Sequence, residues 1–200
     1  MNTYRTLGRA ALILSIVACA RSEPKAIDTT VGAAPPPRPG SAAVAVPSDA
    51  NSPWHVSVGA VGPLRIGMTL AEAASALKVS VPDTAKLDRA CAYVRLDSVP
   101  TSVKLMWVEG HLARVDVDSA SIPTEAGARV GDSESNVRKL YDGRFTESPH
   151  KYVQGGKYIV VSAPMAGDGT LRLVFETDGS KVTRYRAGRE PEVEMVEGCS

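Results

Sequence analysis

The first nineteen residues constrain where this chain can fold. Arg5 and Arg9 precede a short apolar run at residues 10–18, AALILSIVA, which ends at Cys19. A positively charged start, a short apolar stretch and small residues at its end are typical of a secretory signal peptide. The run is too short to span a bilayer, which takes roughly 20 apolar residues. We therefore expect the mature chain to fold outside the cytoplasm, where cysteines oxidise.

Residues 16–19, IVAC, resemble the bacterial lipobox, in which the cysteine is lipidated and becomes the mature N-terminus. The resemblance implies a signal peptide with lipobox at 1–19, palmitate on Cys19 and a lipid anchor in a membrane. Alanine rather than aspartate at position 20 favours the outer membrane, with the protein facing the periplasm. Ala18-Cys19-Ala20 also satisfies the A-x-A rule, so cleavage after Ala20 and release of a soluble protein is the alternative.

The next segment, residues 20–53, has the composition of a tether. Seven of the fourteen prolines lie between Arg21 and Pro53, among runs of Ala, Val, Ser and Gly. Such a segment buries too little apolar surface to offset the entropy lost on ordering. We expect a disordered linker that holds a folded domain, residues 54–200, at some distance from the membrane.

Charge balance excludes one class of partner. The chain carries 23 Lys and Arg against 22 Asp and Glu, a formal net charge of +1. Nucleic-acid binding depends on an excess of basic residues that neutralise phosphates, so we expect no nucleic-acid partner. No helical stretch has a basic amphipathic face, so membrane contact is expected from the lipid anchor alone.

The cysteine count predicts one disulfide. Lipidation uses Cys19, and cleavage after Ala20 would remove it, so Cys91 and Cys199 remain as an even pair in an oxidising compartment. A bond between these two cysteines would close the loop of chain from Cys91 to Cys199, and closing so long a loop stabilises the fold by on the order of 4–5 kcal/mol in the chain-entropy model. A catalytic thiol is the alternative, but a nucleophilic cysteine needs a base and a pocket, and a penultimate residue such as Cys199 seldom lies in one.

Two short helices are predicted by similar stretches, RIGMT at 65–69 and RVGDS at 129–133. Thr69 and Ser133 are suited to N-caps, and Thr69 with Glu72 forms the T-x-x-E pattern of a capping box. Apolar residues at helical spacing follow both N-caps. The glycine in each stretch permits a sharp turn before the helix.

The strands that follow these helices also correspond. Each half has two alternating apolar segments joined by a turn, E-G in one half and D-G in the other, which indicates antiparallel hairpins. We therefore predict an α+β fold of two repeated helix-plus-antiparallel-strand units, about 61–120 and 125–200, forming one two-layer domain. The paired segments are 103–107 with 112–117 and 171–175 with 181–186, and Gly155-Gly156 joins another hairpin, 150–153 with 157–163.

The segment IGMTLAEA at 66–73, with the strands behind it, resembles the small α/β module of two groups of proteins. These are the BamE (SmpA/OmlA) outer-membrane lipoproteins and the β-lactamase inhibitor protein. The resemblance covers most of residues 61–186, but the Gly-x-Pro that often ends the helix in these lipoproteins is absent. It implies helices on one face of an antiparallel sheet, with the other face free to bind a protein, and it implies no catalytic residues.

Alternation of apolar and polar residues along the strands predicts which face of the sheet is free to bind a protein. Val103, Leu105 and Trp107, like 171, 173 and 175, fall on the face expected to pack under the helices. The opposite face mixes arginine, methionine and flanking tyrosine, a composition typical of binding surfaces. A face that is only solvated is the alternative. The candidate binding residues are Lys104, Met106, Tyr152, Tyr158, Arg172, Arg184 and Arg186.

No metal or cofactor motif is present. The three histidines, His55, His111 and His150, lack the spacing of metal ligands. Asp116 and Asp118 alternate on one strand without the glycine-punctuated loop of a calcium site. We expect no cofactor and no metal.

The sequence favours a non-enzymatic envelope lipoprotein whose folded part binds a protein or another envelope component. One alternative is an extracytoplasmic hydrolase that uses His150 with a carboxylate such as Asp142 or Glu147. A structural spacer is the other alternative.

Near the end of the chain, Glu192 and Glu194 alternate with apolar residues, which predicts an edge strand with a solvated acidic face.

Overall fold

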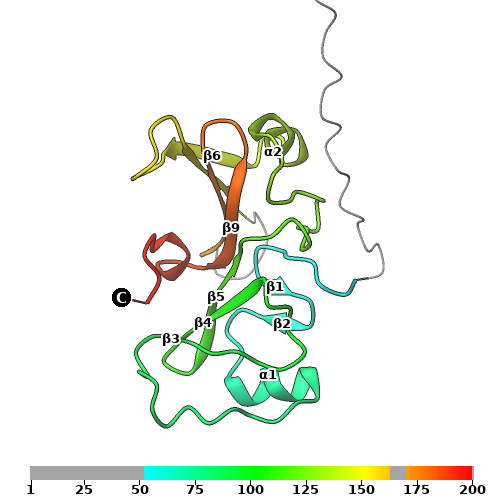
Figure 1. Cartoon of the computed structure of the whole chain (residues 1–200), viewed down its shortest axis with the longest axis vertical. Coiled ribbons are helices and arrows are strands. Elements are labelled where there is room, and N and C mark those ends of the chain that lie inside the picture. Colours follow the sequence, from blue (N-terminus) through cyan, green and yellow to red (C-terminus); the bar gives the residue numbers. More distant parts are fainter. Residues whose placement is uncertain (1–51, 163–169, 200) are drawn as a thin grey trace, which may run out of the picture. The chain divides into compact units, whose positions relative to one another are not determined.

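The computed structural model describes residues 52–162 and 170–199 (Figure 1). The predicted signal peptide, Cys19 and the tether up to residue 51 lie outside these residues. The regular secondary structure of the described chain is mainly β: β1 Ala60–Val61, β2 Leu64–Arg65, β3 Ala92–Tyr93, β4 Val103–Val108, β5 His111–Val117, β6 Phe145–Pro149, β7 Lys157–Ser162, β8 Leu171–Thr177 and β9 Val182–Arg189. The helices are α1 Leu70–Leu77, α2 Glu134–Leu140 and the 3-10 helix η1 Glu192–Glu194.

Strands β3 to β9 form one antiparallel sheet in the order β3-β4-β5-β9-β8-β7-β6, and β1 pairs with β2 in a separate two-stranded sheet. The predicted hairpins β4-β5 and β8-β9 are present, and a third hairpin is β6-β7. The first strand of this third hairpin was predicted wrongly: it is 145–149, and residues 150–153 lie in the loop after it. The centre of the sheet is the pairing of β5 with β9, in which Asp116 lies opposite Arg186. Gly188 permits this approach, because a Cβ there would lie 2.5 Å from the carbonyl oxygen of Ala113.

Both helices begin at the predicted N-caps. Thr69 accepts a hydrogen bond from the Glu72 amide, and the Glu72 carboxylate accepts one from the Thr69 amide at 2.8 Å, which completes a capping box. Ser133 accepts from the Asn136 amide at 3.2 Å. Gly67, with φ +92°, reaches back to the sheet and donates its amide to the carbonyl of Leu112 at 2.7 Å.

The main core lies between the helices and one face of the seven-stranded sheet. Odd-numbered strand residues such as Leu105, Leu173 and Phe175 are buried there with Ala73 of α1 and Val137 of α2. Val103 and Trp107 also belong to this core, as strand alternation predicts. Leu171 is only half-buried.

The opposite face of the sheet is covered by the end of the described chain. After β9, residues Glu190–Cys199, which we call the strap, pack through η1 against β5, β8 and β9. Figure 1 shows the strap in red on the side of the sheet away from α1 and α2. A disulfide joins Cys199 to Cys91, the pair that the cysteine count predicts. Val193 of the strap is fully buried.

Two predictions about this architecture are wrong. The described residues do not form two repeated helix-plus-strand units, because β3 to β9 make a single continuous sheet and the helices are only eight and seven residues long. The strands that follow the two helices differ as well. After α1 comes β3, which has two residues, whereas after α2 come β6 and β7, which form a full hairpin. The predicted acidic edge strand is instead η1, in which Glu192 is buried.

Candidate functional site

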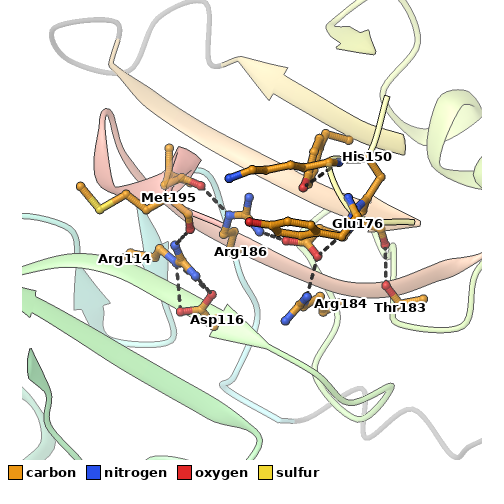
Figure 2. Close-up of polar contacts among 12 residues, drawn as sticks. Arg114, Asp116, His150, Glu176, Thr183, Arg184, Arg186 and Met195 are labelled. Atoms are coloured by element: carbon orange, nitrogen blue, oxygen red, sulfur yellow. Dashed lines mark hydrogen bonds and ion pairs between the residues drawn. The ribbon is translucent and has the colours of Figure 1, made fainter. Parts of the chain in front are cut away.

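Glu176 of β8 is the centre of a buried ionic cluster beneath the strap (Figure 2). Its side chain is 1% exposed, and its carboxylate accepts hydrogen bonds from Arg184 Nε at 2.6 Å and from Arg186 Nη1. His150 Nε2 lies 3.2 Å from the same carboxylate. Two strands, β8 and β9, and the β6-β7 loop therefore meet at one carboxyl group.

Burial raises the pKa of Glu176, but the guanidinium groups of Arg186 and Arg184 outweigh it and hold that pKa below the ordinary value of 4.5. The carboxylate is therefore charged at neutral pH. Its charge balances the buried guanidinium of Arg186, whose side chain is only 3% exposed.

His150 has no nitrogen left for a substrate. Nδ1 accepts hydrogen bonds from the amides of Tyr152 at 3.0 Å and Val153 at 3.2 Å. That leaves Nε2 as the protonated nitrogen, which donates to Glu176. The ring is stacked on Tyr158, with 4.6 Å between ring centroids. This arrangement holds the β6-β7 loop in place.

The carboxylates proposed as partners of His150 lie elsewhere. Glu147 is bound by Arg138 of α2 and by Lys157, whose Nζ lies 3.2 Å from its carboxylate. Asp142 is exposed just after α2. The histidine and carboxylate of the hydrolase alternative are therefore not brought together.

Arg114 connects the sheet to the strap. Its Nη2 lies 2.6 Å from Asp116 and its Nε 2.9 Å from the same carboxylate, so the pair is bidentate. Nη1 donates to the carbonyl oxygens of Glu192, at 3.1 Å, and of Met195. Arg186 likewise donates through Nε to the carbonyl of Val193. Two buried guanidinium groups thus bind three backbone carbonyls of the strap, those of Glu192, Val193 and Met195.

The seven predicted binding residues have different fates. Met106 and Arg186 are buried, so neither lies on an open surface. Arg184 is half exposed and binds Glu176. The free sheet face implied by the resemblance is thus wrong for the region that the strap covers. The others lie as follows: Lys104 is exposed and paired with Asp118, Arg172 is paired with Glu190, Tyr152 is exposed and Tyr158 is half-buried.

An open cavity of about 620 Å³ lies on the helix side of the sheet, between α1, the loop that follows it and β4. Its walls are mainly apolar, and Trp107 forms one of them, held in place by a hydrogen bond from Nε1 to the carbonyl of Val94. Charged residues lie on the exposed part of the lining. The lining residues are Leu70, Thr84, Leu87, Asp88, Arg89, Ala90, Ala92, Val94, Trp107, Glu109 and Gly110.

Sequence reasoning missed Arg114, Glu176 and this cavity. Arg114 and Glu176 are charged residues that directly follow apolar residues in strands that are mostly apolar, a signal that could have marked them as buried partners. The loop at 78–91 has no apolar periodicity, so nothing in it indicated a cavity wall.

Among residues 52–162 and 170–199, no cluster of three or more His, Cys, Asp or Glu could hold a metal ion. Within the same residues, no helix is both long enough and apolar enough to cross a membrane.

No protein-family model and no curated protein sequence matches the chain. Among solved structures, it is similar to the uncharacterized protein yfeY from Escherichia coli, at 19% sequence identity and a TM-score of 0.33. The alignment covers 68% of this chain and 99% of that chain. A TM-score this low carries no argument about fold or function.

Proposed function

We propose that this chain is a bacterial envelope lipoprotein whose folded part binds another envelope component without catalysing a reaction. Lipidated Cys19 holds it at the outer membrane, facing the periplasm, and residues 20–53 are the tether. The signal-peptide and lipobox patterns support this location. The disulfide between Cys91 and Cys199 fits an oxidising compartment.

The cavity beside α1 is the observation that carries the binding role. Its volume of about 620 Å³ falls within the range of small-molecule and cofactor pockets. Trp107 and Val94 are buried parts of its wall, while Leu87 at its edge is 41% exposed. An apolar group entering the cavity would remove the exposed apolar surface of its edge, such as that of Leu87, from water. We infer that the ligand is an apolar group carried by a lipid or by a protein of the envelope.

The chemistry around His150 does not favour the hydrolase alternative. Its two ring nitrogens are used by Glu176 and by backbone amides within the protein. The resemblance to the BamE-type and β-lactamase-inhibitor modules supports a binding role, because it implies no catalytic residues. It does not identify the partner.

A neutral naphthylamine dye, N-phenyl-1-naphthylamine, tests the cavity in vitro. The chain has two tryptophans, Trp54 and Trp107, so Trp54→Phe leaves Trp107 as the single reporter. We expect the dye to bind and to quench Trp107 by energy transfer. In that background Ala90→Phe, which fills the cavity, should weaken binding by about tenfold, or about 1.4 kcal/mol.

Ala85→Phe is the matched control, because Ala85 is exposed in the same loop and does not line the cavity. Equal loss of binding in both variants, or no binding to the parent chain, would contradict the cavity assignment. Labelled palmitate supplied to bacteria that express the chain tests the anchor: it should enter the wild-type chain and not Cys19→Ser.

A further inference from the structure

The contact between the sheet and the strap has the form of a peptide in a groove. Arg114 and Arg186 come from the neighbouring strands β5 and β9, and both donate to backbone carbonyls of the strap. Val193 is the fully buried apolar side chain of the strap, whereas Glu194 and Met195 are exposed. Recognition is therefore mainly of backbone, with a place for one apolar side chain.

The groove does not depend on the strap for its shape. Arg114 is fixed by its bidentate pair with Asp116, which belongs to the same strand β5. Arg186 is fixed by Glu176 of β8. Since both carboxylates belong to the sheet, the two guanidinium groups would keep their positions after the strap left. A preorganised site of this kind loses little entropy when it binds.

The last residues of the strap are held chiefly by the disulfide. Glu197 accepts a hydrogen bond from Tyr152 and lies 3.9 Å from Lys151 Nζ, and all three side chains are exposed. Exposed pairs of this kind contribute little free energy. Cys91 and Cys199 are themselves partly exposed, so a dithiol can reach the bond.

We propose that the strap is a releasable plug in a peptide-binding groove. Reduction of the Cys91–Cys199 disulfide removes the covalent hold and lets the strap leave, and Arg114 and Arg186 then bind the backbone of a segment of another protein that adopts the same 3-10 turn as η1. The reductant is a dithiol oxidoreductase, and its envelope location rests on the proposed localisation. One of its thiolates attacks a sulfur of the bond and its second thiol resolves the mixed disulfide. Two electrons and two protons reach Cys91 and Cys199, and the oxidoreductase is left as a disulfide.

Hydrogen exchange on the purified chain, oxidised and fully reduced, tests the release. We expect reduction to raise the exchange of amides in residues 192–199 by about tenfold or more. Amides of β5 and β9 should stay protected, because the sheet does not depend on the strap. A strap that stays as protected as in the oxidised chain would overturn the proposal and leave the disulfide a structural staple. Loss of protection throughout β5 and β9 would overturn it as well.

A second measurement tests the groove. In the full chain carrying Cys199→Ser and Val193→Asp, the strap loses both its covalent and its apolar hold. A fluorescent peptide with the sequence of residues 190–198, EPEVEMVEG, should bind this variant and not the oxidised wild-type chain. Adding Arg114→Gln should weaken that binding about tenfold, by loss of hydrogen bonds from a charged donor. Absence of binding to the folded variant would refute the groove.

Should the double variant not fold, the reduced wild-type chain replaces it. The tethered strap then competes at a high effective concentration, so the peptide is supplied at about millimolar concentration. Protection of β5 and β9 amides by the peptide supports the groove, and unchanged exchange overturns it. Neither measurement involves the cavity beside α1, so their failure is separate from failure of the proposed function.

Discussion

At the scale of single residues, Glu176 determines how the strap-covered face holds its charges. Its buried carboxylate receives Arg184, Arg186 and His150. Without this carboxylate, Arg186 would be a buried cation lacking its partner, which is strongly destabilising. Arg184 is half exposed, so its own contribution is small.

The low pKa of Glu176 predicts acid sensitivity. Because the folded-state pKa lies below the unfolded value, the carboxylate stabilises the fold above pH about 4.5, and this stabilisation is lost as the pH falls through the folded value. The pKa of Glu147 is also lowered, by its hydrogen bond with Arg138, which adds to the same trend. We expect the free energy of unfolding, measured in urea, to fall steadily between about pH 5 and pH 3.

Glu176→Gln separates this effect from general acid denaturation. The variant should lose about 3 kcal/mol at pH 7 and should show a shallower decline towards pH 3 than the wild-type chain. Glu194→Gln, at an exposed position of the strap, is the control and should match the wild type. A decline as steep in Glu176→Gln as in the wild type would disprove this role.

The sequence located Arg184 and Arg186 on the right face of the sheet but not in the right surroundings. Strand alternation tells which residues share a face, because side chains point to opposite sides in turn. It does not tell what covers that face. Arg186 was therefore interpreted as part of an open surface, although it is buried under the strap.

At the scale of elements, the pairing of β5 with β9 holds the two hairpins β4-β5 and β8-β9 in one sheet. Gly188 lies opposite Arg114 and close to the backbone of β5. A methyl group there would come within 2.5 Å of the Ala113 carbonyl oxygen and 2.9 Å of the Arg114 Cα. Backbone atoms cannot move aside as a flexible side chain can.

Gly188→Ala is therefore expected to lower the free energy of unfolding by about 1–3 kcal/mol, through overpacking at the centre of the sheet. Equilibrium denaturation measures this. Thr146→Ala, on the exposed strand β6, should change stability by less than about 0.5 kcal/mol. Wild-type stability in Gly188→Ala would show that β5 and β9 do not approach as closely as described.

Local patterns predicted individual elements better than their assembly. The caps at Thr69 and Ser133 and the three hairpins depend on neighbouring residues, so their signals lie within short windows. The β5-β9 pairing joins residues about seventy positions apart, and no turn connects them. The similar halves of the sequence were for this reason interpreted as repeated units, whereas the chain builds one sheet.

At the scale of the whole molecule, one disulfide connects two candidate binding regions. Cys91 lies between Ala90 and Ala92, which line the cavity beside α1, and Cys199 ends the strap on the opposite face of the sheet. The cysteine count predicted the bond from the compartment alone. The bond also links the cavity wall to the strap. This link depends on the pairing of β3 with β4, which the spacing of the cysteines in the sequence does not reveal.

Photo-crosslinking in a bacterial host tests the central proposal, that this chain is anchored in the envelope and binds an apolar group in its cavity. A benzophenone side chain replaces Leu87, at the cavity edge, in the full-length chain. We predict a reproducible adduct with one membrane-fraction component, absent when Ala90→Phe fills the cavity and retained in the Ala85→Phe control. An adduct that persists in Ala90→Phe, or no adduct at all, would contradict the account.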